Sequence, residues 1–291
     1  MIVVGVMGIS MSSILVKYSA APSPVTAAFR LLWTVILMCP VALCKASVRD
    51  ELKRMSMKLI ALSAASGLFL AIHFVLWFES LQHTSVTSST TIVCTEVIWV
   101  CMGFCLFLGG RLSLKAVAAI AVTLVGSALI AYADSGSTSQ LYGDILALLA
   151  AIAVAAYTLI GRLVRATVTT TAYTFIVYTA CSAVLLITCF AQGVNLLGYG
   201  ISPIVVGVLL AVFSTILGHS IFSWCLKYFS PSFVSASKLC EPVGAGLLAA
   251  LLFGEIPTMV QLFGSGLILG GVFWYSKIER NSELRNKTSG K

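Results

Sequence analysis

Two glutamates, Glu96 and Glu241, lie deep inside long apolar runs of this 291-residue sequence. A charge at the centre of a membrane helix costs about 2.5–3.5 kcal/mol on insertion scales, so each such group needs a partner or a wet cavity. A carboxyl group at that depth suits a carrier that binds and releases protons. The alternative for Glu96 is structural, namely a hydrogen bond or ion pair with Arg30.

Arg30 and Lys238 are cations within the same apolar runs. The planar fork of Arg30 is suited to clamping a carboxylate or phosphate of a solute, whereas snorkelling or a structural pair with Glu79 or Glu96 is the alternative. Lys238 and Glu241 are three residues apart, so on one helix they share a face and neutralise each other. Pro242 frees backbone carbonyls there, and such backbone usually lines a cavity, so a solute contact for both side chains stays open.

Six further polar or aromatic side chains are candidates to line a solute or proton site. His73 and Trp77 are four residues apart and share a helix face. A histidine can relay protons near neutral pH, but a buried one is more often a simple hydrogen-bonding partner. Ser89 belongs to a polar turn, 88–91, whose hydroxyls either bond their own helix or face a polar solute. The six candidates are His73, Trp77, Ser89, Tyr157, Tyr178 and His219.

Catalytic and metal-binding patterns are missing from the sequence. The nine cysteines form no Cys-x-x-Cys pair and no cluster with histidine, so we expect no metal and no cofactor. The aspartates Asp50, Asp134 and Asp144 fall at predicted helix ends or in loops, where they cannot form the site of a prenyltransferase or an aspartyl protease. A membrane-embedded enzyme is therefore the least favoured class, and we predict that the protein is not an enzyme.

The elements that position these side chains are predicted to be membrane helices. Hydrophobic residues make up 59% of the chain and charged residues 10%, with a mean hydropathy of +1.03, which excludes an ordinary soluble domain. A spanning helix needs about 20 mainly apolar residues. We therefore predict an all-α integral membrane protein with ten transmembrane helices, near 1–18, 25–44, 58–80, 86–107, 116–133, 143–161, 172–191, 203–226, 232–253 and 259–276.

The second half of the chain repeats the first at an offset of 145 positions, the difference between 241 and 96. This offset also places Gly126 on Gly271 without any gap. Each half holds five apolar stretches, and an odd number inverts the second copy in the membrane, as in many secondary transporters. The predicted units are two inverted five-helix repeats, 1–133 and 143–276, and a basic cytoplasmic tail, 277–291.

Charge placement predicts the orientation. With the amino terminus inside, 15 of the 18 lysines and arginines fall in cytoplasmic segments. The predicted external loops 82–85, 134–142, 192–202 and 254–258 contain none. This asymmetry follows the positive-inside rule, so both termini are predicted to be cytoplasmic in a multi-pass protein of the cell (plasma or inner) membrane. The net charge of +8 then reflects insertion and contact with the lipid bilayer, and we expect no nucleic-acid partner.

Several short motifs follow one another in order along the two halves of the chain. They are Phe29-Arg30, Thr84-Ser85-Val86, Gly109-Gly110-Arg111-Leu112-Ser113, Glu241-Pro242-Val243, Gly254-Glu255 and the glycine-rich run from Gly264 to Gly271. With them, residues 1–276 resemble the EamA-type transporters of the drug/metabolite transporter superfamily. The chain departs at Gly110, where the family usually has a glutamate, and at Thr95-Glu96-Val97, where a small residue and a proline are common. The resemblance implies carrier-mediated movement of small metabolites, often outward, around a central cavity.

The leading hypothesis is a secondary transporter that moves a small organic metabolite or drug by alternating access, as an exporter coupled to protons or to exchange. In it Glu96 takes the proton, Arg30 attracts an anionic group, and Trp77 shapes the site. The alternatives are a channel and a non-transporting membrane scaffold.

Small residues in the last two predicted helices indicate close packing, either within the second repeat or as the seam of a homodimer. The expected facing sets are Gly244, Gly246, Ala249 and Ala250 against Gly264, Gly266, Gly270 and Gly271.

Overall fold

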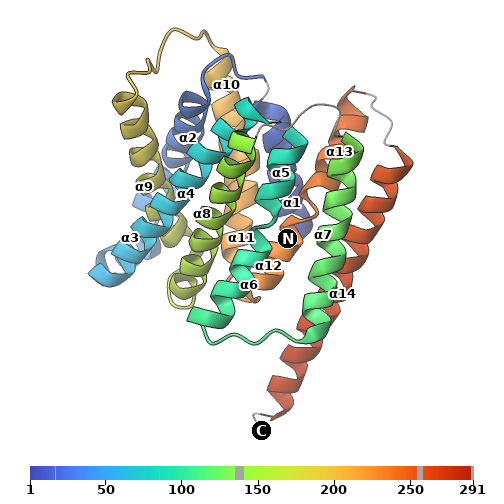
Figure 1. Cartoon of the computed structure of the whole chain (residues 1–291). Coiled ribbons are helices and arrows are strands. Elements are labelled where there is room, and N and C mark those ends of the chain that lie inside the picture. The colour runs from blue at the N-terminus through green and yellow to red at the C-terminus, as the bar shows by residue number, and fades with distance from the viewer. Residues whose placement is uncertain (17, 85, 135–140, 254–257, 290–291) are drawn as a thin grey trace.

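The structure is a computed structural model that describes residues 1–16, 18–84, 86–134, 141–253 and 258–289. These residues form a bundle of helices without a strand (Figure 1). The first half contains α1 (Ile2–Val16), α2 (Ser23–Cys44), α3 (Ala46–Arg54), α4 (Met57–His83), α5 (Val86–Cys94), α6 (Glu96–Phe107) and α7 (Leu114–Asp134). The second contains α8 (Leu141–Arg165), α9 (Thr170–Ala191), α10 (Ser202–Leu209), the π-helix η1 (Leu210–His219), α11 (Ser220–Cys225), α12 (Pro231–Lys238), α13 (Glu241–Phe253) and α14 (Met259–Ser289).

Several of these helices are long and apolar enough to cross a membrane. Six segments of the described chain qualify by length and composition, and shorter apolar helices accompany them. The predicted class, an all-helical membrane protein, is therefore confirmed. The six segments are Ser23–Cys44, Met57–His83, Leu141–Arg165, Thr170–Ala191, Ser202–Cys225 and Met259–Ile278.

Three of the predicted stretches are interrupted rather than continuous. The stretch 86–107 breaks at Thr95, between α5 and α6, and 232–253 breaks between α12 and α13. In 203–226, the ten residues of η1 adopt a π-helix. Pro242 explains the second break, because it has no N–H to donate to the preceding turn. At the first break, the Thr95 hydroxyl donates to the Ile92 carbonyl oxygen at 2.6 Å.

The interruption of the first half, between α5 and α6, has a counterpart in the second half, between α12 and α13. Glu96 is the first residue of α6, and Glu241 is the first residue of α13, at the same offset of 145 positions. α7 corresponds in the same way to α14, although α14 continues to Ser289 and so includes the predicted tail. α3 has no such counterpart. It is a short helix on the predicted cytoplasmic side between α2 and α4, and the second half has no helix between α9 and α10.

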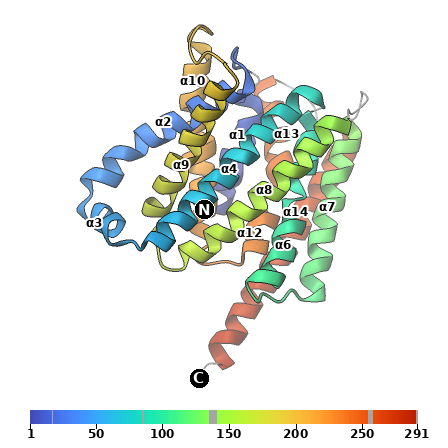
Figure 2. The same ribbon diagram turned by 60° about the vertical axis from the view of Figure 1, so that its left-hand side comes forward.

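α7 and α14 pack side by side at one edge of the bundle (Figures 1 and 2). A Cβ atom added at Gly126 would lie 2.6 Å from the Gly264 carbonyl oxygen, and one added at Gly271 would lie 3.0 Å from the Ala119 carbonyl oxygen. The offset converts Gly126 into Gly271 and Ala119 into Gly264, so the contact is reciprocal. Because higher numbers on one helix meet lower numbers on the other, the pair is antiparallel.

This pairing corrects the predicted packing of the glycine-rich helices. Gly264 and Gly271 of α14 face α7 in the other half of the chain, whereas Gly244 of α13 packs against Ser10 of α1. Gly266 and Gly270 face open space. The expectation used only the short connection between neighbouring helices, which does not fix the rotation of either helix. The surroundings of Gly246, Ala249 and Ala250 lie outside what the structure describes.

The helices that surround the bundle centre are α1, α4, α8 and η1. α4 packs against α8 and α9, while α1 packs against η1 and α13. The largest buried apolar cluster joins α2, α4, α8 and α9 and includes Leu31, Phe74, Val154 and Tyr178. These contacts bring polar side chains of both halves to one central region.

Candidate functional site

A cavity of about 50 Å³ lies between the two halves of the chain, a space that holds a few water molecules. Of the ten predicted site residues, seven line it: Arg30, His73, Trp77, Glu96, His219, Lys238 and Glu241. The other lining residues are Ile9, Ser12, Thr90, Val93, Cys94, Val154 and Leu239.

Many of the lining residues form pairs across the repeat. At the offset of 145 positions, an equivalent position also lines the cavity in four cases. The cavity therefore lies where equivalent surfaces of the two halves meet. The four pairs are Ile9 with Val154, Val93 with Lys238, Cys94 with Leu239, and Glu96 with Glu241.

The two halves are joined at the cavity by an ion pair. The Lys238 ammonium lies 2.8 Å from Oε1 of Glu96, and the two side chains are only 11% and 5% exposed. Glu96 is in the first turn of α6, where the helix dipole also favours a negative charge. The expectation that Lys238 pairs with Glu241 is wrong, because the helix breaks between them and their shared face is lost.

Arg30 is buried, and the groups that it contacts are neutral. Its Nε donates to the Thr215 hydroxyl at 2.9 Å and its Nη1 to the Ser12 hydroxyl at 3.2 Å. The guanidinium also lies 4.4 Å from the centre of the Phe74 ring, a cation–π geometry. Within the described chain, no carboxylate lies at ion-pair distance from Arg30.

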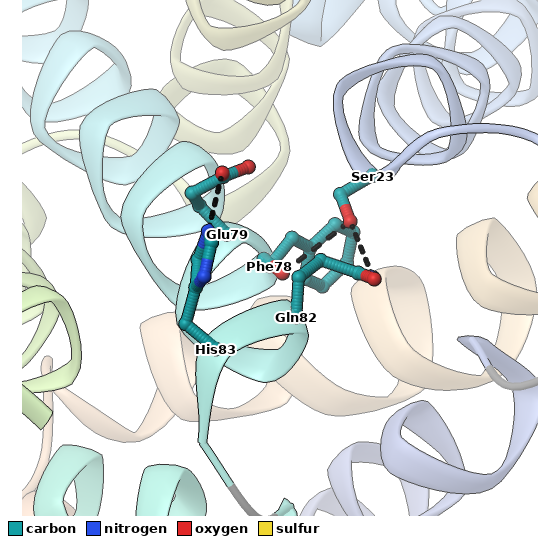
Figure 3. Close-up of polar contacts among 5 residues, drawn as sticks. All are labelled: Ser23, Phe78, Glu79, Gln82 and His83. Atoms are coloured by element: carbon teal, nitrogen blue, oxygen red, sulfur yellow. Dashed lines mark hydrogen bonds and ion pairs between the residues drawn. The ribbon is translucent and has the colours of Figure 1, made fainter. Parts of the chain in front are cut away.

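The structural pairs considered for Arg30 are therefore not formed. Oε1 of Glu79 lies 3.1 Å from Nε2 of His83, one turn away on α4 (Figure 3). The same view shows Gln82 donating to the Ser23 hydroxyl at the start of α2. Glu79 thus belongs to the end of α4, and Glu96 is held by Lys238.

The π-helical segment positions one of the groups that hold Arg30. The Thr215 hydroxyl donates to the Leu210 carbonyl oxygen, five residues earlier, at 3.2 Å. The oxygen of the same hydroxyl accepts a hydrogen bond from Nε of Arg30. The wider turn of a π-helix therefore gives Thr215 a fixed orientation towards α2, and π-helical segments are frequent at functional sites.

The two histidines differ in their surroundings. Nδ1 of His73 lies 3.0 Å from the Ala150 carbonyl oxygen of α8, and its ring stacks on Trp77 at 5.9 Å between centroids. A carbonyl oxygen only accepts, so Nδ1 of His73 carries a proton. His219 packs edge-on against Phe74 and Tyr157, and its Nδ1 has no hydrogen-bond partner among the described residues.

Besides Oε1 of Glu96, which lies beside the Lys238 ammonium, three lining side chains carry buried polar atoms that have no hydrogen-bond partner in the described part of the chain. They are Nε1 of Trp77, Oγ1 of Thr90 and Nδ1 of His219. Leaving a buried donor or acceptor unpaired costs about 1–3 kcal/mol. Such atoms around one cavity can form hydrogen bonds with water or with a solute.

The three remaining predicted residues lie behind the cavity wall. The Tyr157 hydroxyl is 2.9 Å from the Ser223 hydroxyl, and the Tyr178 hydroxyl is 3.0 Å from the Ser220 hydroxyl. Ser89 accepts from the Ser80 hydroxyl at 2.8 Å. These three side chains do not line this cavity, and neighbouring helices engage their hydroxyls. From the polar turn it is Thr90 that reaches the cavity, and the side chains of Ser88 and Thr91 lie outside the described residues.

Sequence reasoning missed the hydroxyls that hold Arg30. Ser12 is one of three serines in α1, and Thr215 lies beside Ser214 in an apolar run. Only the rotation of these helices distinguishes them from their neighbours. The offset of 145 positions, by contrast, could have predicted Ile9, Val93 and Cys94 as lining residues. Their equivalents in the second half also line the cavity that contains Glu241.

A family comparison agrees with this arrangement. Residues 1–132 and 141–277 match the model of the EamA-like transporter family. The chain belongs to the EamA-like transporter family. It is thus a multi-pass membrane protein of a transporter family, and the resemblance seen in the motifs is confirmed.

Relatives of this EamA-like transporter carry the same general description. An "Uncharacterized transporter YxxF" of Bacillus subtilis (strain 168) is 27% identical over 238 residues, which cover 78% of this chain and 73% of the relative. An "Uncharacterized transporter" of Archaeoglobus fulgidus is 38% identical over 63 residues, or 23% of its length. One solved crystal structure of another protein has a TM-score of 0.79 over 97% of each chain at 17% identity, which shows a shared fold.

Proposed function

We propose that the protein is a secondary transporter that exports a small organic solute across the cell membrane by alternating access, coupled to protons or to exchange. The observation that carries this proposal is the cavity between the two halves, which is lined by the buried Arg30, Glu96 and Lys238, by the partly buried Glu241, and by polar atoms without a hydrogen-bond partner among the described residues. Binding sites at the interface of two repeats, next to interrupted helices, are the usual arrangement in secondary transporters.

The proposed architecture has ten spans in two inverted repeats, 1–133 and 143–276. The matching interruptions before Glu96 and Glu241 and the reciprocal antiparallel contact of α7 with α14 support it. The α6–α7 connection, the α8–α9 turn and the end of α14 lie together at the lower end of the bundle in Figure 1. Basic residues gather at this end: Arg111 lies in the α6–α7 connection, Arg162 and Arg165 lie in the last turn of α8, and four more lie towards the end of α14. We therefore place this end and both termini in the cytoplasm.

Arg30 is proposed to bind an anionic group of the solute. Among the described residues, its charge is met only by hydroxyls and the Phe74 ring, so a carboxylate or phosphate would supply the missing counter-charge. The indole N–H of Trp77 and the hydroxyl of Thr90 have no hydrogen-bond partner in that part of the chain and can donate to oxygens of the same group.

The pair of Glu96 with Lys238 is proposed to couple this binding to protons. A proton on Glu96 removes the negative charge that holds Lys238, and with it a direct link between α6 of the first half and α12 of the second. Release of that link favours separation of the halves on one side of the membrane. The other charged or titratable groups lining the cavity are Arg30, His73, Cys94, His219 and Glu241.

The test is flux in proteoliposomes that contain the purified protein. Radiolabelled organic acids, amino acids and nucleosides are offered with and without an imposed pH gradient. Saturable accumulation that collapses with the gradient supports a proton-coupled carrier, and counterflow without a gradient supports exchange. Non-saturable flux would support a channel, and no flux with any solute would overturn the transport proposal.

A homodimer through the outer face of α14 is proposed as the oligomeric form. Gly266 and Gly270 on this face have open space around them, and small residues let helices of two copies approach closely. Mass measurement in nanodiscs tests it, and a monomer would overturn it.

A further inference from the structure

The two equivalent glutamates have unequal surroundings. Glu96 pairs with Lys238, and the position equivalent to Lys238 in the first half is Val93. The repeat therefore places no lysine in the first half that could pair with Glu241 as Lys238 pairs with Glu96. Within the described residues, the Glu241 carboxylate has neither a hydrogen bond nor an ion pair, although it lines the cavity.

Arg30 and Glu241 are held by neighbouring residues of one helix. The Ser10 hydroxyl of α1 has one proton and shares it between two backbone carbonyl oxygens, that of Val6 at 2.8 Å and that of Glu241 at 3.1 Å. Two residues further along, the Ser12 hydroxyl accepts from Nη1 of Arg30 at 3.2 Å. The cavity thus contains a cation and an anion beside the same turn of α1, and they form no ion pair with each other.

We propose that the cavity binds a zwitterionic solute, with the anionic group on Arg30 and the cationic ammonium group on Glu241. This inference rests on the proposed transport function and specifies its substrate class. A solute with only an anionic group would leave Glu241 without a counter-charge, and one with only an ammonium group would leave Arg30 without one. Both situations are expensive at this depth. A zwitterion supplies a counter-charge to both Arg30 and Glu241 and adds no net charge to the cavity.

The remaining polar groups fit the same orientation. Trp77 and Thr90 offer an N–H and an O–H, which complement the oxygens of a carboxylate. Lys238 is already paired with Glu96, so it does not compete with Arg30 for the solute anion. Glu241 is left as the carboxylate available for the ammonium group.

The test is equilibrium binding to the purified full-length protein in nanodiscs, measured by titration calorimetry. The probes have four carbons each: 2-aminobutyrate and 4-aminobutyrate as zwitterions, butyrate as the anion and butylamine as the cation. We expect one zwitterion to bind at least about tenfold more tightly than butyrate and butylamine, since tenfold corresponds to 1.4 kcal/mol. Equal affinities for all four probes, or no binding of any probe to folded protein, would overturn the inference.

Two variants separate a direct contact from a general disturbance. Glu241→Gln keeps the shape and removes the charge, and it should lower the ratio of zwitterion to butyrate affinity about tenfold. Glu79→Gln is the matched control, because Glu79 lies at the end of α4 outside the cavity, and it should leave the ratio unchanged. A ratio unaffected by Glu241→Gln would overturn the assignment, and Glu241→Asp should retain most of the preference.

The outcome is distinguishable from failure of the transport proposal. Selective zwitterion binding without flux in proteoliposomes would overturn the transport cycle and leave the binding site in place. Flux of organic acids with no preference for zwitterions would overturn this inference alone.

Discussion

Glu96 of α6 and Lys238 of α12 form an ion pair of 2.8 Å that joins the two halves of the chain beside the central cavity. Each of them lies at an interruption of its span, Glu96 just after one and Lys238 just before the other. The pair therefore links two interruptions of the bundle rather than two points within continuous helices. In the proposed transport cycle, its strength would determine how readily the halves move apart.

Breaking this pair is the first prediction. Glu96→Ala leaves the Lys238 ammonium buried without its partner, and removal of one member of a buried pair costs about 3–5 kcal/mol of unfolding free energy. The double variant Glu96→Ala/Lys238→Met removes both charges and should recover most of that loss. Thermal unfolding in detergent measures both. Equal stability of the single and double variants would show that the pair contributes little.

Glu96→Gln tests proton coupling separately from stability. The amide cannot release a proton, so accumulation driven by a pH gradient should fall to the level seen without a gradient. Counterflow under equal pH on both sides should continue, because the cavity keeps its shape. Gradient-driven accumulation at the normal rate in this variant would assign the coupling to another group.

Arg30→Lys keeps the charge but loses the planar fork that contacts both Ser12 and Thr215. We expect the affinity for an anionic or zwitterionic solute to fall about tenfold or more, because an ammonium cannot bind a carboxylate through two parallel hydrogen bonds. Competition against a radiolabelled solute gives the affinity. Unchanged affinity in a folded Arg30→Lys protein would exclude a direct clamp.

The contact between α7 and α14 should respond to small increases in size. Gly126→Ala places a methyl group 2.6 Å from a backbone oxygen of α14, so the helices must separate, at a cost of about 1–3 kcal/mol. Gly266→Ala adds the same methyl group in open space around the single chain, so it serves as the control when both variants are measured as monomers. A drop in melting temperature for Gly126→Ala alone is the expected result, and equal values would place the interface elsewhere.

Trp77→Phe probes the unpartnered indole N–H at the cavity. The ring that stacks on His73 is largely kept, while the donor is removed. The free protein should lose little stability, because no hydrogen bond is broken. Solute affinity should fall several-fold if the N–H donates to a solute oxygen, as a typical hydrogen bond contributes about 0.5–1.5 kcal/mol. An unchanged solute affinity would show that Trp77 only packs at the cavity surface and does not donate to the solute.

The repeat in the sequence predicted much of the site. An offset of 145 positions related Glu96 to Glu241, and both do line one cavity. Composition and the length of the apolar stretches also identified the helical membrane class. What it could not provide is the rotation of each helix about its axis, which decides that Ser12 faces Arg30 and that Gly264 faces α7.

The pairing of charges was less accessible to sequence reasoning. The expected pair of Lys238 with Glu241 assumed a continuous helix, where residues three apart are neighbours. Pro242 was a visible sign of a break there, but Thr95 carries no comparable signal for the break in the first half. Once both helices are interrupted, Lys238 is free to reach across to the other half.

The pairing of cavity positions across the offset has an energetic consequence. Two identical halves that exchange their roles would give an inward-open and an outward-open form of equal free energy. Apart from α3 and the π-helix η1, the two halves place similar elements at equivalent positions, but their charges differ. Val93 stands at the position equivalent to Lys238, and Phe175 stands at the position equivalent to Arg30. In the proposed alternating-access cycle, these few side chains would therefore determine which of the two forms the empty carrier prefers.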